Sequence, residues 1–306
     1  MQEELLQKLQ ELSHTVVAVA EESDLRKDLE LDSLGMAQLL VMLEEEYGVS
    51  EPDPSGLRTA GDVWKLVQSG AAKRDLETAG WHELLLQPPA GGLDELFGAW
   101  TRSDRILTSA ARAILRAWSA VWHRLEIRGL ECLPPDGPYL ICPNHQSLPD
   151  PLFLYARLPR ALLEKLLFIA WEGYFRRTPY LWLNRIGRVL PTGGNSRLPD
   201  CLRLAYEGLN RGRIVCIFPE GGRTTTGRVM KPRLGAGILA VETGAPIYPV
   251  RIEGATGSLS MLRSGMHFCK ITLTILDPIR PPRCAPGAME DYRRLMDQWA
   301  EAVRDA

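Results

Sequence analysis

The chain has 306 residues, of which 45% are hydrophobic and 24% charged, so it can bury at least one large core and is not a disordered protein. The net charge of −2 hides an asymmetry: residues 1–70 carry 15 acidic and 5 basic residues, a net of −10, whereas the remainder carries 31 basic and 23 acidic residues, a net of +8. This asymmetry predicts two domains of opposite charge.

The six cysteines lie far apart without a CxxC pair, so we expect neither a disulfide framework nor a metal site, and the thiols are typical of a reduced, cytoplasmic protein. The chain starts with an acidic amphipathic stretch instead of the basic start of a secretory signal, so no signal is expected. No apolar run reaches about 18 residues, so we expect no membrane-spanning helix.

Residues 1–70 show helical spacing of apolar side chains in "EELLQKLQEL", "LGMAQLLVMLEEEYG" and "TAGDVWKLVQ". This pattern predicts a small all-α domain. The periodicity loosens after it, and the breaker "QPPAGG" indicates a linker over 71–102, although Trp81 and residues 84–86 suggest that part of the linker docks on another surface.

The stretch "SDRILTSAARAILRAWSAVW" at 103–122 predicts a basic amphipathic helix. Such a helix packs on its own domain or lies at a membrane interface, and both alternatives stay open. Short apolar runs then alternate with helical patterns, namely "PYLIC", "LLFIA", "GRVLP", "RIVCIF", "PIYPVRI" and "ITLTIL". Residues 103–306 are therefore expected to form an α/β domain around a mixed, mostly parallel sheet, in which the prolines of "PIYPVRI" indicate an edge strand or a bulge.

Ser33 lies in "LDSLGMAQLLVMLEEEYGV" at the start of a predicted helix. Ser33 or Asp32 can cap that helix, but a capping box needs Glu or Gln three residues later, and Met36 or Gly35 stands there. With "TAGDVWKLV" further on, the first 70 residues resemble an acyl carrier protein of four helices. The resemblance implies that a phosphopantetheinyl transferase attaches 4'-phosphopantetheine to Ser33. An acyl-activating ligase is then expected to load the carrier.

His145 and Asp150 lie in "YLICPNHQSLPDPLF", five residues apart after a predicted strand. The prolines that flank Asp150 favour a turn that folds its carboxylate back onto the imidazole. Alternatively, His145 is a hydrogen-bonded core residue and Asp150 a helix N-cap followed by proline. In "RIVCIFPEGGRTTTG", Arg223 follows Glu220 and Gly221 in a glycine-rich loop, an arrangement suited to a phosphate ester, although an incidental surface arginine is the plain alternative.

Together, "NHQSLPD", "FPEGGR" and "APIYPV" resemble the NHx4D, FPEGTR and proline-containing motifs of the glycerolipid acyltransferases, of which bacterial 1-acylglycerol-3-phosphate acyltransferases are members. The resemblance covers about residues 127–278. It implies that His145 is a general base and that Asp150 orients it. The substrate-binding set that it implies is Asn144, Glu220, Gly221, Arg223 and Arg233.

Gly193 in "GRVLPTGG" stands where the family has a second phosphate-binding arginine, so Arg188 or Arg197 are possible substitutes and the acceptor can differ from plain lysophosphatidate. The predicted function is acyl transfer from a phosphopantetheine thioester, on its own carrier or on acyl-ACP, to a lysophospholipid such as 1-acylglycerol-3-phosphate in phospholipid biosynthesis.

Two alternatives stay open. The carrier serves other enzymes while the acyltransferase uses acyl-CoA or a specialised lysolipid, or the carrier-like unit is an unmodified docking module. We expect peripheral contact with the inner face of the cell membrane through 103–122 and "YFRRTPYLWL". We expect no nucleic-acid partner, because the basic excess is modest and lacks a recognition module.

Overall fold

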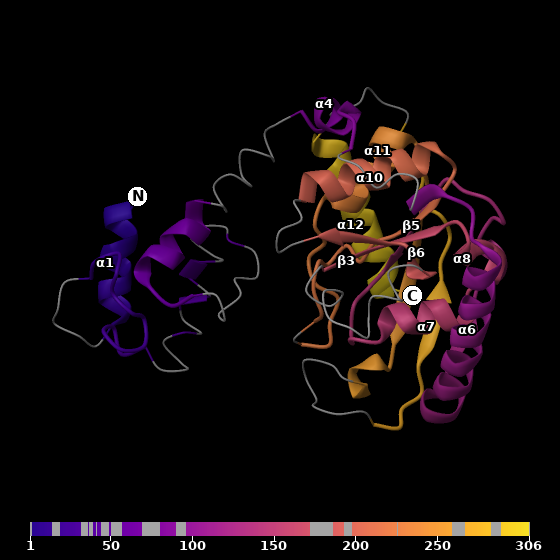
Figure 1. Cartoon of the computed structure of the whole chain (residues 1–306), viewed down its shortest axis with the longest axis horizontal. Helices are drawn as coiled ribbons and strands as arrows, with labels where there is room; N and C mark the ends of the chain where they lie inside the picture. The colour runs from indigo at the N-terminus through magenta and orange to yellow at the C-terminus, as the bar shows by residue number, and fades with distance from the viewer. Residues whose placement is uncertain are drawn as a thin grey trace. The chain divides into compact units, whose positions relative to one another are not determined.

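The computed structural model describes residues 2–13, 19–31, 36, 39–40, 42–43, 49, 57–68, 80–89, 96–171, 186–192, 198–224, 226–258, 267–282 and 289–305. The chain divides into two compact units, Met1–Gly80 and Trp81–Ala306. Figure 1 shows the course of the chain from the helical first unit to the α/β second unit.

The described part of the first unit combines helices with turns at 19–31 and a β-bridge between Asp24 and Thr59. Helix α1 spans Gln2–Leu12, residues 60–68 form another helix, and residues 36, 39, 40, 42 and 43 are also helical. The helices bury apolar side chains at helical spacing in a core of their own, which includes Leu5, Leu9, Leu39, Leu43 and Val63. A helical carrier-like unit is therefore present, and the full count of four helices stays a prediction.

The second unit is a single sheet covered by helices. Its strands are β1 (Glu126–Arg128), β2 (Tyr139–Pro143), β3 (Leu166–Trp171), β4 (Val189–Thr192), β5 (Ile214–Cys216), β6 (Ile247–Glu253) and β7 (Thr272–Ile275). Its helices are α4 (Trp81–Leu86), α6 (Arg102–His123), α7 (Asp150–Arg157), α8 (Arg160–Leu163), α10 (Leu198–Asn210), α11 (Gly235–Thr243) and α12 (Met289–Asp305), with short 3-10 turns at Leu130–Cys132 and Ala255–Gly257.

The strands form one sheet in the order β1-β7-β6-β2-β5-β3-β4, in which only the β6–β7 pair is antiparallel. The mixed, mostly parallel sheet expected from the sequence is confirmed. The expectation of an edge position for "PIYPVRI" is wrong, because β6 lies between β7 and β2. Val250 pairs with Ile275 but Ile247 bridges Ile279, so three residues oppose two around Pro249. This bulge accommodates the missing N–H of Pro249.

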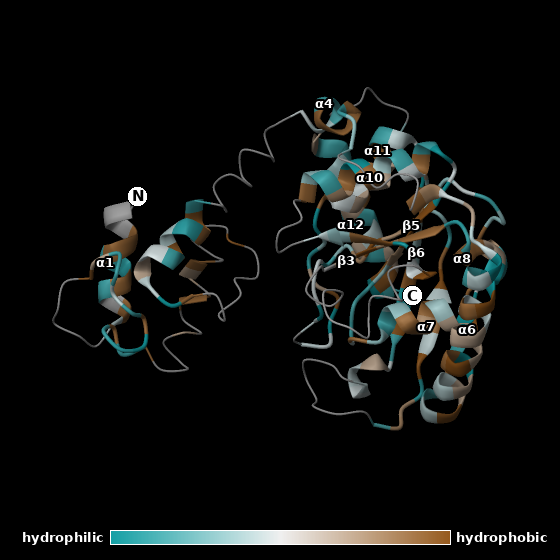
Figure 2. Ribbon diagram, in the orientation of Figure 1, coloured by the Kyte–Doolittle hydropathy of each residue, from teal (hydrophilic) through white to brown (hydrophobic). Residues whose placement is uncertain are grey.

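The sheet separates two helical layers. On one face, Tyr139 and Ile141 of β2 share a core with residues of α6, α7 and α8, such as Trp118, Phe153 and Leu162. Helices α10, α11 and α12 contact strands β2 to β6 and one another, and Trp299 of α12 donates to the carbonyl of Cys142 at 2.8 Å. Figure 2 shows the strands between these layers as hydrophobic. The near-continuous apolar sequences of the strands follow from burial on both faces.

The interval 71–102, expected to be a linker, is only partly outside the second unit. From Trp81 onward the chain belongs to that unit, and helix α4 packs on α10. Arg203 of α10 donates to the carbonyl oxygen of Leu84 at 2.9 Å, and the side chains of Trp81 and Leu85 are buried. Residues 69–79 lie outside the described residues, so the end of the carrier at residue 70 stays a prediction.

Helix α6 begins with a capping box between Thr101 and Asp104 and ends at Arg124 in the left-handed conformation. It packs on α7, and its buried stripe includes Thr108, Ala111 and Ser119. The packing alternative for 103–122 is therefore realised, while the opposite face remains exposed. None of the helices in the described part of the chain is long and apolar enough to span a membrane.

Candidate active site

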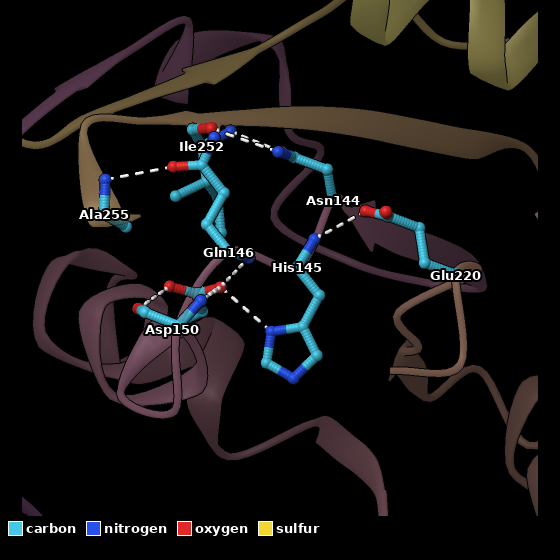
Figure 3. Close-up of polar contacts among 8 residues, drawn as sticks. Asn144, His145, Gln146, Asp150, Glu220, Ile252 and Ala255 are labelled. Carbon is cyan, nitrogen blue, oxygen red and sulfur yellow. Dashed lines mark hydrogen bonds and ion pairs between the residues drawn. The ribbon is translucent and has the colours of Figure 1, made fainter. Parts of the chain in front are cut away.

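Two of the predicted site residues, one catalytic and one substrate-binding, lie where parallel strands end. His145 follows β2 by two residues and Glu220 follows β5 by four, and β5 and β6 are the parallel neighbours of β2. The carboxyl ends of these strands therefore meet at one edge of the sheet, the usual place for a functional site in such folds. Figure 3 shows the polar contacts at this edge.

His145 and Asp150 contact each other directly. The Nδ1 atom of His145 lies 2.9 Å from Oδ2 of Asp150, and the aspartate side chain is fully buried while the imidazole is 18% exposed. Because the carboxylate can only accept, Nδ1 carries the proton and the neutral ring has a free lone pair on Nε2. In Figure 3 the second ring nitrogen of His145 points away from Asp150. It is free to receive a proton from a substrate.

The carboxylate of Asp150 is held by the loop that precedes it. Its Oδ2 accepts hydrogen bonds from the backbone N–H groups of Gln146 and Ser147, at 2.7 and 2.9 Å, and its Oδ1 accepts from the Ser147 hydroxyl. Pro149, not Asp150, occupies the N-cap of α7, without a side-chain cap. Asp150 therefore organises the 145–150 loop instead of capping the helix, which rejects the N-cap alternative.

Glu220 joins the histidine loop to the glycine-rich loop. Its Oε1 accepts from the backbone N–H of His145 at 2.7 Å, and its Oε2 accepts from the N–H of Met230 at 2.7 Å. Burial raises the pKa of Glu220 to about 7, and the two backbone donors oppose this rise. With both oxygens engaged, Glu220 positions the two loops, and its predicted contact with the substrate stays a prediction.

Asn144 is also a positioning residue. Its side-chain amide donates to the carbonyl of Ile252 at 3.1 Å and accepts from the Ile252 N–H at 2.6 Å. The residue is buried and these two bonds engage both ends of its amide. The side chain therefore fixes the end of β2 to β6, and the predicted substrate contact of Asn144 stays a prediction.

The phosphate-binding set predicted from the sequence comes from two segments that meet. Gly221 has φ +73°, and a Cβ at this position would lie 2.5 Å from Nε of Arg233. The backbone N–H of Arg233 donates to the Pro219 carbonyl at 2.8 Å. The Arg233 side chain thus lies against Gly221, where both the backbone angle and the close approach require glycine.

Arg223 lies in a stretch that is fixed to the histidine loop. The N–H of Thr224, the next residue, donates to the carbonyl of His145 at 2.9 Å. The backbone next to Arg223 is therefore held at the residue that carries the imidazole. The described part of the chain has no group of three or more His, Cys, Asp or Glu placed to hold a metal ion.

Three contributors were not singled out from the sequence. The ring of Phe218 lies 4.4 Å from the imidazole of His145, centroid to centroid, and lines one side of it. Ser147 supports Asp150, and the Gln146 side chain accepts from the N–H of Ala255 at 3.0 Å. All three residues belong to the quoted motif stretches, but their partners are visible only in the fold.

Arg188 does not replace the missing second phosphate-binding arginine. It is buried, donates to the carbonyl oxygens of Leu96 and Gly98 at 3.1 and 2.5 Å, and lies over the ring of Trp100. Burial lowers the pKa of Arg188 to about 10. Its guanidinium therefore anchors the segment before α6 instead of facing a ligand.

Several predicted residues lie outside the described residues: Ser33, Gly193, Arg197 and the stretch "YFRRTPYLWL". Near the first of these, Met36 is helical and buried in the core of the first unit. Ser33 thus stands three residues before a helical residue, and its place at the start of a helix stays a prediction.

Two family models match the chain. Residues 124–253 match an acyltransferase model, and residues 3–54 match a model described as a phosphopantetheine attachment site. The chain therefore carries a phosphopantetheine-binding domain and an acyltransferase domain, as predicted.

Curated relatives match over part of their length. A chloroplastic 1-acyl-sn-glycerol-3-phosphate acyltransferase of Brassica napus is 31% identical over 175 residues, which are 53% of this chain and 49% of the relative. A 1-acyl-sn-glycerol-3-phosphate acyltransferase of Pseudomonas aeruginosa is 33% identical over 151 residues, 45% of this chain and 56% of the relative. The chain thus spans about half the length of these relatives.

Among solved structures, the crystal structure of the 1-acyl-sn-glycerophosphate acyltransferase from Thermotoga maritima is similar. The match has a TM-score of 0.55 and 22% identity and covers 77% of this chain and 96% of the other. This similarity shows a shared fold.

Proposed function

We propose that this chain, which carries a phosphopantetheine-binding domain and an acyltransferase domain, moves a fatty acyl group from a phosphopantetheine thioester to the hydroxyl of a lysophospholipid. The observation that carries the proposal is the contact of His145 with buried Asp150, which leaves Nε2 of the imidazole as a base. The names of the relatives, all 1-acyl-sn-glycerol-3-phosphate acyltransferases, support this acceptor class.

The reaction needs only the chain's own groups and the two substrates. Nε2 of His145 takes the proton of the lysolipid hydroxyl as its oxygen bonds to the thioester carbonyl carbon. The tetrahedral intermediate then expels the thiolate, which receives the proton from the imidazolium. Asp150 stabilises the imidazolium and keeps Nδ1 protonated throughout. In this mechanism the lysolipid hydroxyl attacks the thioester directly, and no acyl-enzyme forms on a serine, threonine or cysteine.

The acceptor's phosphate is assigned to the loop of Gly221, Arg223 and Arg233. Support comes from the approach of the Arg233 side chain to Gly221 and from the tie between Thr224 and His145. An arginine in such a loop offers paired N–H donors to phosphate oxygens. Because Arg188 is anchored elsewhere, a phosphodiester lysolipid, which carries less charge than lysophosphatidate, is a second candidate acceptor.

The donor is assigned to the first unit. When bound to Ser33, 4'-phosphopantetheine supplies the thiol on which the acyl group is carried. A phosphopantetheinyl transferase attaches it and an acyl-activating ligase loads it. The acidic charge of residues 1–70 suits recognition by basic partners. Free acyl-ACP or acyl-CoA is the alternative donor, and the reaction is placed at the inner face of the cell membrane, where the lysolipid lies.

A direct assay tests the function. The purified chain receives a labelled acyl thioester with lysophosphatidate or with a phosphodiester lysolipid, and the lipids are separated. Labelled phosphatidate, or the corresponding diacyl phosphodiester, is the expected product. Production of free fatty acid alone, or no turnover with any lysophospholipid and either donor, would overturn the proposal.

A further inference from the structure

The outward face of α6 carries an apolar stripe. Ile106, Ile114 and Val121 have exposed fractions of 63%, 69% and 74%. Spacings of eight and seven residues place these side chains on one face of the helix. Phe268 continues this surface through its ring, which stacks on Trp122 at 4.3 Å between centroids. Figure 2 shows hydrophobic and hydrophilic residues alternating along α6.

Next to the stripe, arginines line a hollow. Arg112 and Arg116 of α6 and Arg160 of α8, with Ser109 and Ala113, surround a space of about 380 Å³. Arg112 and Arg116 are one helical turn apart, where like charges repel. Ser109, which lines the hollow, lies three residues after Ile106, and residues three apart on a helix are neighbours, so the hollow borders the apolar stripe at Ile106.

The positive charge around the hollow exceeds the negative charge. Glu164 is shared, because its Oε1 lies 3.5 Å from Nε of Arg160 and 3.6 Å from Nε of Arg105. Burial lowers the pKa of Arg112, and the charge of Arg116 lowers it further.

The pKa of Arg157, at the end of α7, is lowered by the same two causes, first by burial and then by the charge of Arg116. The carboxylate that opposes this shift is Glu126, which also pairs with Lys270 and Arg128. Within the described part of the chain, the Nε atoms of Arg112 and Arg157 are buried without a hydrogen-bond partner. A buried cationic donor without an acceptor is costly, so this cluster is suited to receive an anion.

We propose that the hollow formed by Arg112, Arg116 and Arg160 binds the phosphate of an anionic phospholipid while the apolar stripe of α6 enters the membrane surface. Arginine binds phosphate through paired N–H donors. An amphipathic helix that combines arginines with exposed apolar residues is suited to the interface of an anionic bilayer. A soluble phosphate explains the arginines but not the neighbouring exposed isoleucines.

This inference rests on the proposed function only in that the acceptor is a membrane lipid. It assigns the membrane contact to a site distinct from the His145 loop and names its ligand chemistry. The binding measurement below needs no turnover, and His145→Ala is expected to bind vesicles as the wild type does. Failure of membrane binding and failure of catalysis can therefore be told apart.

The test is co-sedimentation of the full chain with vesicles of phosphatidylcholine, alone or with part replaced by phosphatidylglycerol. We expect the wild type to bind the anionic vesicles more strongly. In the double variant Arg112→Gln/Arg116→Gln, the partition coefficient onto anionic vesicles should fall by roughly 30-fold, at about fivefold per charge removed. The matched control, Arg293→Gln with Arg304→Gln, removes the same net charge from exposed positions of α12 and should lose much less.

Two further arms identify the occupant. Ile114→Ser should weaken binding to both kinds of vesicle, because it acts on the apolar stripe. Inorganic phosphate is titrated calorimetrically into the wild type and the α6 double arginine variant. If the variant loses phosphate binding but binds vesicles as the wild type does, the ligand is a soluble phosphate and the proposal is overturned. Equal losses of vesicle binding in the α6 and α12 double variants also overturn the proposal. The proposal is overturned as well if the α6 double variant keeps vesicle binding and loses only acyl transfer from the carrier.

Discussion

The two units bury different kinds of side chain. In the described part of the first unit every buried side chain is apolar, whereas the described part of the second unit buries Asn144, Ser147, Asp150, Glu220 and seven other polar or charged residues. Buried polar groups are retained only where their partners are arranged around them. The difference fits the proposed function, in which the first unit is a stable support for an added group. The second keeps its chemistry inside the fold.

The largest effect that this comparison predicts is on His145. His145→Ala removes the base that accepts the hydroxyl proton, and we expect the transfer rate to fall by about 10⁴-fold, the upper range for general-base catalysis. The measurement is single-turnover formation of diacyl lipid. Modification of Ser33 and the circular-dichroism spectrum should be unchanged. A variant that transfers at the wild-type rate would show that the proposed mechanism is wrong.

Asp150→Asn should reduce the rate by up to about 10⁴-fold, because the amide no longer stabilises the imidazolium or fixes the Nδ1–H tautomer. Ser147→Ala is the matched control: it removes one donor to Asp150 but leaves the 2.9 Å contact with His145. The control should lose much less activity. Equal losses in both variants would indicate that Asp150 acts only by holding the loop.

Glu220 connects the buried polar groups to pH. Burial raises the pKa of Glu220 from its usual 4.5 to about 7, so the folded state holds this proton when the unfolded state has lost it. The group's stabilising contribution is full below about pH 4.5 and falls as the pH rises to about 7. Across this window the unfolding free energy of the wild type should fall by roughly 3 kcal/mol relative to that of Glu220→Gln. Denaturant unfolding, followed by tryptophan fluorescence at several pH values, measures it, and a flat difference contradicts the assignment.

The smallest predicted effect separates anchoring from binding. Arg188→Gln should lower the free energy of unfolding by about 1–3 kcal/mol, because it removes the donors to Leu96 and Gly98. The KM for the lysolipid should stay the same. Arg223→Gln should show the opposite pattern, a higher KM with little change in stability. A raised KM in Arg188→Gln would restore this residue as a phosphate ligand.

Much of the fold was predictable because its signals are local. The six apolar runs quoted from the sequence all contain strands, since residues buried on both faces of a sheet form continuous apolar segments. Strand β1 was missed, because three residues that include Glu126 and Arg128 show no periodicity. The prolines of β6 left an edge position and a bulge open, and the sequence could not decide for the bulge, because a bulge beside Pro249 depends on the register of a distant segment.

The site was predictable only in part, for the same reason. The residues of the histidine loop are close in sequence, so a turn between His145 and Asp150 could be anticipated. The partners of Asn144 and Glu220 are 108 and 75 residues away, and no local pattern reports them. Arg188 was considered for phosphate because of its type and position, whereas its burial and backbone partners are properties of the packed fold.

The most direct test of the account is the intact mass of the chain, modified with phosphopantetheine and loaded with a fatty acyl group, before and after addition of lysophosphatidate vesicles. If the chain's own carrier donates to the His145 site, the acyl mass leaves the wild-type chain and appears in phosphatidate, and it stays on His145→Ala. Retention of the acyl group by the wild type, with phosphatidate formed only from added acyl-CoA or acyl-ACP, would contradict donation by the chain's own carrier. Loss of the acyl group at equal rates from both chains would contradict the role of His145.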